Sequence, residues 1–176
     1  MRYEFYSGNA GNIRDYIERG LLDIGLMSEP VDIRKYEFIS MPVKEEWGAL
    51  VRTDSPLAQK EHIVPQDLAH IPLISTLGEF MESNIGKWFG EYAGDVDVIA
   101  KGNLLYNEAM LAESNLGVVI GIRLNCSYEG LRFIPLSPAL ESGTALAWKK
   151  EQMFSAATAS FIDFSKKFIR GITDHK

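Results

Sequence analysis

The sequence predicts an α/β protein with mostly parallel sheets. Some segments have alternating or consecutive apolar residues, which is typical of strands. They alternate along the chain with segments in which apolar residues recur every three or four positions, which is typical of helices. At 176 residues, with 46% hydrophobic and 24% charged residues, the chain can form one domain or two small lobes. We expect two lobes, because the pattern starts anew at Pro72 and returns near Ala145.

The first part of the chain predicts a strand, a turn, a helix and three further strands. Residues 2–6 alternate apolar and polar side chains, which predicts a strand, and residues 7–9 interrupt it. The helix that follows is expected to end at Gly20, because glycine suits the left-handed residue after a helix. The first two strands should pair in parallel through a right-handed crossover. The later strands are predicted at 22–27, 37–41 and 47–52.

The second lobe is predicted to begin at Pro72. This proline ends a short helix whose first turn holds Pro65, and a strand starts directly after it at Leu73. The strand runs into the polar pair Ser75-Thr76. A helix with an apolar stripe at positions i, i+3, i+4 and i+7 follows, and we interpret the stripe as core. It consists of Ile85, Trp88, Phe89 and Tyr92.

Two more helices are predicted. Asn103 is the expected N-cap of the first, and Gly117 is expected to end it. Ser155 is the expected N-cap of the last. The buried stripe of the last helix is predicted to be Ala157, Phe161, Phe164 and Phe168. Strands are predicted at 96–100, 118–122, 131–136 and 145–148.

Charge and composition exclude several classes of function. The chain has 18 lysines and arginines against 24 acidic residues, so it lacks the excess of positive charge that binds a nucleic-acid backbone. Its longest apolar run is far below the roughly 20 residues of a membrane span. Cys126 is the single cysteine and cannot form an internal disulfide, and no signal peptide precedes the first polar stretch. These features favour a cytoplasmic protein.

Candidates for catalysis or metal binding are few. His62, His70 and His175 lie in polar or terminal stretches, where solvated histidines are expected. Together with Cys126 they have no recognisable metal-ligand spacing. Cys126 has no neighbouring histidine to activate it, so a packed or idle thiol is favoured over a nucleophile. The sequence predicts neither a cofactor nor a metal.

Polar segments of small residues recur where a strand ends and a helix begins. They are Ser7-Gly8-Asn9, Ser75-Thr76 and Gly102-Asn103. In open α/β sheets the crevice outside such strand ends binds ligands, and helix N-termini favour a carboxylate or phosphate group. Helix capping is the alternative explanation for each segment. Three of them in two lobes are consistent with a cleft for a small, anionic metabolite.

A series of short motifs also runs along nearly the whole chain in a fixed order. It consists of Tyr6 to Asn9, Gly20 to Leu26, Trp47 to Val51, Asp54 to Ala58, Asp67-Leu68, Pro72 to Ile74, Ala112 to Val118 and Leu146 to Lys150. Each motif alone is weak. The ordered set resembles the effector-binding, or substrate-binding, domain of LysR-type transcriptional regulators.

The resemblance implies an α/β fold of type II periplasmic-binding-protein architecture, with two Rossmann-like lobes joined by two crossover strands. Lobe one would comprise residues 1–70 plus 144–176, and lobe two residues 71–143. A small-molecule effector would bind in the cleft between the lobes and act as an allosteric signal in a cytoplasmic homodimer that is not an enzyme. The residues implied to line the cleft are Ser7, Gly8, Asn9, Ser75, Thr76, Asn103 and Leu104.

The sequence departs from this family in two ways. The winged helix-turn-helix is absent, so DNA would be bound only through a segment outside this chain. The strand and helix that normally precede residues 2–6 are also absent. Lobe one should therefore have a gap filled by a neighbouring chain, or a direct pairing of residues 2–6 with residues 23–26. A solute-binding protein of a transport system is the main alternative, and an enzyme on the same fold is the third.

Overall fold

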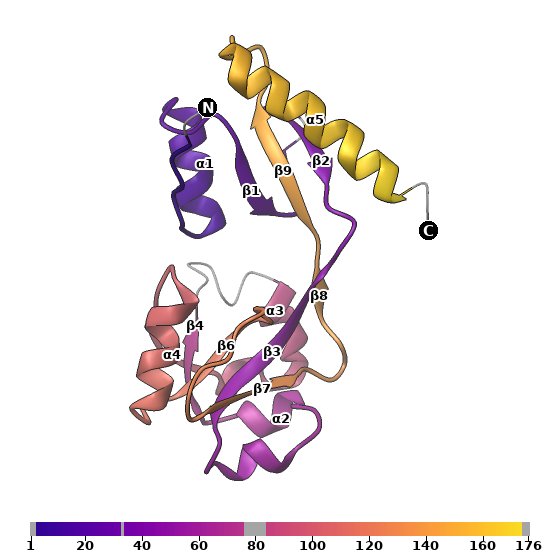
Figure 1. Cartoon of the computed structure of the whole chain (residues 1–176). Helices are drawn as coiled ribbons and strands as arrows, with labels where there is room; N and C mark the ends of the chain where they lie inside the picture. Colours follow the sequence, from indigo (N-terminus) through magenta and orange to yellow (C-terminus); the bar gives the residue numbers. More distant parts are fainter. Residues whose placement is uncertain (1–2, 33, 76–83, 174–176) are drawn as a thin grey trace. The chain divides into compact units, whose positions relative to one another are not determined.

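The computed structural model describes residues 3–32, 34–75 and 84–173 and divides the chain into two compact units (Figure 1). Unit 1 comprises Met1–Lys44 and Ser142–Lys176, and unit 2 comprises Glu45–Glu141. Each unit has its own sheet and its own hydrophobic core. The chain passes between the units twice, so unit 1 is discontinuous in sequence and unit 2 is inserted into it.

Unit 1 is built on a three-stranded antiparallel sheet in the order β1-β9-β2. β1 (Gly25–Ser28) and β2 (Tyr36–Ser40) each pair with β9 (Thr144–Lys149), which comes from the C-terminal part of the chain. α1 (Ala10–Glu18) and α5 (Ala156–Thr173) complete the unit. Its core consists of Ile13, Ile17, Met27, Val31, Tyr36, Ala145 and Ala147.

The segment before α1 does not form the expected strand. Residues 3–9 are irregular, and β9 is the only partner of β1 among the described strands. The expected parallel pairing of residues 2–6 with residues 23–26 is therefore wrong. Alternation of Tyr3 and Phe5 with polar residues indicates only which face each side chain would take, and a strand also needs a neighbour to share its hydrogen bonds. Phe5 is accordingly 95% exposed.

The helix α5 begins where the sequence predicts it but buries a different face. Ser155 Oγ accepts a hydrogen bond from the Thr158 N–H at 3.1 Å, as expected of an N-cap. The buried side chains are Thr158, Ile162, Ser165 and Ile169. The predicted stripe is wrong, because Phe161, Phe164 and Phe168 are all exposed. Both stripes have helical spacing, so periodicity alone could not choose between them.

Unit 2 is built on a mixed sheet in the order β5-β4-β6-β3-β7. Its strands are β3 (Glu45–Arg52), β4 (Pro72–Ser75), β5 (Asp97–Lys101), β6 (Val118–Ile122) and β7 (Leu131–Pro135). β4 is parallel to β5 and β6, whereas β3 is antiparallel to β6 and β7. The short strand β8 (Glu141–Ser142) also pairs with β3.

The expectation of mostly parallel sheets is therefore wrong for unit 1 and holds only for part of unit 2. Parallel neighbours need a crossover connection between them, usually a helix. In unit 2, α3 (Asn84–Trp88) lies between β4 and β5 in sequence, and α4 (Leu105–Glu113) lies between β5 and β6. No such helix separates β6 from β7, and these two strands both run antiparallel to β3.

Both faces of the unit 2 sheet are buried. Successive strand residues point to opposite faces, and those of β3, β4 and β6 alternate between two core clusters. One cluster packs with α2 (Pro65–Leu68) and α3, and its strand residues are Ala49, Val51, Leu73, Val118, Ile120 and Ile134. The other packs with α4, and its strand residues are Leu50, Ile74, Val119 and Leu131.

The helices of unit 2 have different ends from those predicted. The helix expected over residues 85–92 stops at Trp88, because Gly90 has a φ of +54°, and a 3-10 helix over Gly90–Asp95 follows. The N-cap of α4 is Leu104 instead of Asn103. The left-handed residue after α4 is Asn115, with a φ of +60°, instead of Gly117.

The boundary between the units also differs from the expected one, because residues 45–70 belong to unit 2. β3 lies between β6 and β7 in the sheet, and Ala58, Ile63 and Leu68 are buried in the same core. The N–H of Ile63 donates to the carbonyl of Pro135 at 2.9 Å. The proline at position 72 that predicted a new lobe instead begins the second strand of an existing one.

Candidate functional site

Two polar strand ends lie next to each other in unit 2. β4 and β5 are parallel neighbours, so their carboxyl ends meet at the same edge of the sheet. The N–H of Gly102, just after β5, donates to the carbonyl of Ser75 at the end of β4 at 2.9 Å. Asn103 and Leu104 follow and are exposed. The structure thus brings Ser75 close to the turn that carries the other two predicted residues, while Thr76 lies outside the described residues.

The predicted residues of unit 1 lie directly before α1. Asn9 is the N-cap of this helix, and its Oδ1 accepts a hydrogen bond from the Asn12 N–H at 3.0 Å. Ser7 is exposed. Gly8 is confined, because a Cβ there would lie 3.1 Å from the Asn12 Cβ and 3.2 Å from the ring of Tyr6. These three residues precede a helix as predicted, but they do not follow a strand within the described residues.

Sequence reasoning missed two residues that stand beside these turns. Asn12 in α1 and Glu108 in α4 carry buried side-chain oxygens without a hydrogen-bond partner among the described residues. One sequence signal could have found Glu108. It falls on the stripe Leu105, Glu108, Ala109 and Ala112, which has the i, i+3, i+4 and i+7 spacing of a buried helix face. A charged residue at such a position conflicts with the pattern around it.

Glu108 lies in the first turn of α4 and is only 2% exposed. Its carboxyl group lies against Gly102, where any side chain would overlap Glu108 Oε1. Burial raises the pKa of this carboxyl above its usual range, and the nearby backbone of Leu104 opposes that shift by a smaller amount. The strand-to-helix turn of unit 2 therefore encloses a carboxyl group whose neutral form is favoured by its surroundings.

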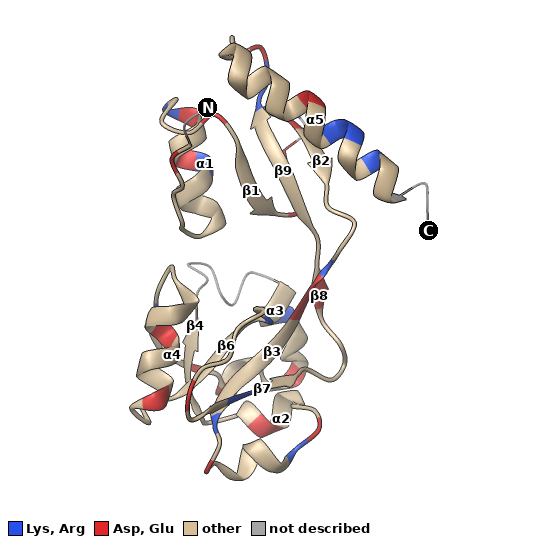
Figure 2. Ribbon diagram, in the orientation of Figure 1, with Lys and Arg blue, Asp and Glu red and all other residues tan. Residues whose placement is uncertain are grey.

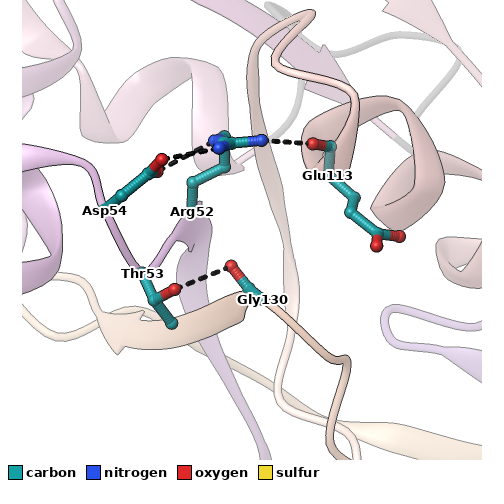
Figure 3. A network of polar contacts seen from close by, with 5 residues as sticks. All are labelled: Arg52, Thr53, Asp54, Glu113 and Gly130. Atoms are coloured by element: carbon teal, nitrogen blue, oxygen red, sulfur yellow. Dashed lines mark hydrogen bonds and ion pairs between the residues drawn. The ribbon is translucent and has the colours of Figure 1, made fainter.

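An ion-pair network holds the other end of α4 (Figure 3). Arg52, at the end of β3, donates from Nη1 to the carbonyl of Glu113 at 2.6 Å, and from Nε and Nη2 to Asp54 at 2.9 and 2.6 Å. Arg52 lowers the pKa of Asp54, mainly through these side-chain hydrogen bonds. Beside it, Thr53 Oγ1 donates to the carbonyl of Gly130 at 3.2 Å. The last turn of α4 is thus tied to β3.

A separate pocket of about 300 Å³ also lies within unit 2. Its lining comes from β3, β6 and β7, from Leu105, and from residues 123, 124 and 126–128. Arg123 in this lining is already engaged, since its guanidinium lies 4.4 Å above the Phe133 ring and pairs with Glu46. Cys126 is exposed, so it is not the packed thiol that we considered from the sequence. The sequence did not predict this pocket.

The part of the chain that the structure describes has neither a metal-binding cluster nor a membrane-spanning helix. There, no group of three or more His, Cys, Asp or Glu residues is arranged to hold a metal ion. Among the same residues, no helix combines the length and apolarity needed to cross a membrane. His62 and His70 are exposed, and His175 lies outside the described residues.

Comparison with known proteins gives one family. The LysR substrate binding domain family matches residues 1–170. The Hca operon transcriptional activator HcaR of Escherichia coli (strain K12) is 24% identical over 163 residues, which are 89% of this chain and 54% of HcaR. The chain therefore spans about half the length of this relative.

Solved structures of regulator domains have the same fold. The effector binding domain of QuiR in complex with shikimate has a TM-score of 0.81 and 19% identity, and the alignment covers 96% of this chain and 81% of that one. The CcmR regulatory domain of Synechocystis PCC6803 in complex with 2-PG has a TM-score of 0.73 and 17% identity, with coverage of 92% and 80%. The chain has the mixed α/β, type II periplasmic-binding-protein fold of these domains, and a transport protein is not favoured. It belongs to the LysR substrate-binding domain family.

Proposed function

We propose that this chain is the ligand-sensing, effector-binding domain of a LysR-type transcriptional regulator. The observation that carries the proposal is the family match over residues 1–170, on a fold whose two polar strand ends meet beside Gly102. QuiR and CcmR, which share this fold, were solved with shikimate and with 2-PG. The effector is a small metabolite, and the binding signal passes to a DNA-binding segment elsewhere in the regulator.

The effector-binding residues that we propose come from both units. They are Ser7, Gly8 and Asn9 of unit 1 and Ser75, Thr76, Asn103 and Leu104 of unit 2. The effector carries an anionic group, which the backbone N–H groups at the start of α1 bind. A helix N-terminus offers free donors and a partial positive charge, which supports this choice. An effector that contacts both units favours the arrangement of the units to which it binds more tightly, and it shifts the equilibrium by that difference in affinity.

Isothermal titration calorimetry of the chain with a panel of organic acids, amino acids, shikimate and 2-PG tests this function. We expect saturable binding of at least one anionic compound. Binding only of cations or large apolar compounds would contradict the anionic effector, and no binding at all would contradict the sensing function itself.

A matched pair of variants tests the proposed site. Asn9→Ala removes the N-cap of α1 and a proposed contact with the effector, whereas Ser155→Ala removes the N-cap of α5 alone. Each lost cap costs about 1 kcal/mol of stability. Only Asn9→Ala should weaken binding of the compound found by calorimetry. Equal effects of the two variants on binding would contradict the assignment.

The proposed regulator domain acts as a homodimer in the cytoplasm and catalyses no reaction. Membership of a transcriptional-regulator family supports the cytoplasmic, non-enzymatic role. Two surfaces support the dimer: the exposed stripe Phe161, Phe164 and Phe168 of α5, and the edge of β1 that has no partner among the described strands. Exposed apolar faces and unpaired strand edges both mark sites where proteins associate.

Sedimentation equilibrium tests the dimer. Phe164→Lys combined with Phe168→Lys should dissociate it, because charged side chains cannot be buried without partners. Asp163→Lys, an exposed position on the same helix outside the stripe, is the matched control and should leave the dimer intact. A wild-type chain that stays monomeric at every concentration would contradict this proposal.

A further inference from the structure

The carboxyl group of Glu108 is buried without a partner. The residue is 2% exposed, and by hydrogen-bond geometry neither side-chain oxygen has a partner among the described residues; the backbone of Leu104 lies near enough only to oppose part of the rise in the pKa of the carboxyl. The ion pairs found in unit 2 join other acids, such as Asp54 and Glu46, to their arginines. A carboxyl group can accept hydrogen bonds through its oxygens in both its neutral and its ionised form. Glu108 therefore has two acceptors that the described part of the protein leaves unused.

Packing does not explain why an acid stands here. The neighbours of Glu108 on the buried face of α4 are Leu105, Ala109 and Ala112, and this face packs on Ile74 and Val119 of the sheet. An apolar side chain would satisfy every contact of this kind. A buried polar group without a partner destabilises the fold and calls for an explanation, such as a group that binds it.

The surroundings of the carboxyl group point to a ligand. It lies in the first turn of the nine-residue helix α4, whose N-cap Leu104 offers no side-chain hydrogen bond. It also lies against Gly102, the residue that links the end of β5 to the end of β4 through Ser75. The unused acceptors thus stand at the strand-to-helix turn that we propose as the unit 2 part of the effector site.

We propose that Glu108 determines effector specificity by accepting a hydrogen bond from a hydroxyl or ammonium group of the effector. This inference rests on the proposed function and adds the class of ligand. In its ionised form Glu108 would repel an acid group of the effector and attract an ammonium group, whereas in either form its oxygens can accept a hydrogen bond from a hydroxyl group. The effector is therefore an acid that also carries a hydroxyl or an amino group.

The test uses series of acids that differ by one donor. The series are propanoate, lactate and alanine; succinate, malate and aspartate; and cyclohexanecarboxylate with its hydroxy and amino derivatives. Calorimetry of the wild-type chain should show, in at least one series, that a donor-bearing acid binds about tenfold or more tightly than its parent. Which derivative is preferred identifies the donor as hydroxyl or ammonium.

Variants of Glu108 connect this preference to one side chain. Glu108→Leu should abolish the preference, so that the parent and the donor-bearing acids bind this variant equally. Glu108→Gln keeps one acceptor and should retain a hydroxyl preference in part but lose an ammonium preference. Glu113→Gln, an exposed position on the same helix, is the matched control and should bind like the wild type. Thermal melts of each variant confirm that it is folded.

The outcomes separate this inference from the proposed function. Equal binding of parent and donor-bearing acids to the wild type, or a preference that survives in Glu108→Leu, would overturn the role of Glu108 and leave the sensing function standing. If no acid of any series binds and the wider panel also fails, both the sensing function and the role of Glu108 are overturned.

Discussion

Glu108 illustrates how a single residue can link folding to pH. Burial raises the pKa of its carboxyl in the folded chain, whereas the unfolded chain has an ordinary value of about 4.3. The folded state therefore prefers the protonated form. The stability that this preference provides is fully present below the unfolded pKa and is lost as the pH rises through the folded pKa.

We predict that Glu108→Gln becomes more stable relative to the wild type as the pH rises from about 4 towards neutrality. The reason is that glutamine cannot ionise, whereas ionising the buried carboxyl of Glu108 destabilises the folded chain. Thermal melts of both proteins across this range measure the difference. Glu113→Gln, whose side chain is exposed, should show no such trend. A stability difference that does not change with pH would contradict the prediction.

At the scale of single elements, the two faces of α5 have different roles. Ile162 is 5% exposed and packs inward, whereas Phe164 is 63% exposed. Figure 2 shows that the C-terminal half of this helix is basic, with Lys166, Lys167 and Arg170 as its cations. Lys166 Nζ lies 5.1 Å above the Trp148 ring, a cation–π contact between α5 and β9.

We predict that Ile162→Ala destabilises the chain by about 2–4 kcal/mol, because it removes buried methyl groups and leaves a cavity. Phe164→Ala should change the stability of the monomer by less than about 1 kcal/mol, because the ring is mostly outside the core. Urea unfolding of dilute protein measures both. A larger loss of unfolding free energy for Phe164→Ala than for Ile162→Ala would show that the buried face of α5 is the one predicted from the sequence.

The helix α4 depends on Arg52 at one end. We predict that Arg52→Ala lowers stability by about 1–2 kcal/mol, because the Glu113 carbonyl and Asp54 both lose their donor. Arg52→Lys should recover less than half of this loss, since one ammonium cannot make the two-pronged contact with Asp54 and also reach Glu113. Chemical unfolding reports the stabilities. Full recovery by lysine would show that only the charge matters.

At the scale of the whole molecule, unit 2 is one continuous segment and unit 1 is not. The five main strands of the unit 2 sheet and its two core clusters lie within residues 45–141, whereas the sheet of unit 1 needs β9 from the far end of the chain. Continuous segments with their own core are able to fold independently.

We therefore predict that a fragment of residues 45–141 folds by itself, whereas a fragment of residues 1–44 does not. Circular dichroism and a cooperative thermal transition of each fragment are the readouts. As a control, a fragment that starts at residue 71, the expected lobe boundary, should not fold, because it lacks the interior strand β3, which lies between β6 and β7. An unfolded 45–141 fragment would contradict the division into these units.

The sequence by itself determined the family, most element positions and the two strand-end turns. Motif order identifies the family because glycines, prolines and small polar residues are required at particular turns. Helical and strand periods locate β3, β4 and β6 because local geometry follows local sequence. Ser155 was predicted as an N-cap and caps α5, whereas the predicted N-cap Asn103 is replaced by Leu104; Asn9 caps α1, which was the alternative explanation for its segment.

The tertiary structure alone decided which partner each element has. A period of two cannot decide whether residues 3–6 join a sheet, and a period of 3.6 cannot choose between the Ile162 and Phe164 faces of α5. Strand direction, the unit boundary at residue 45 and the burial of Glu108 also depend on residues distant in the sequence. Periodicity is a local property, whereas burial and pairing free energies arise from contacts that form only when the chain is folded.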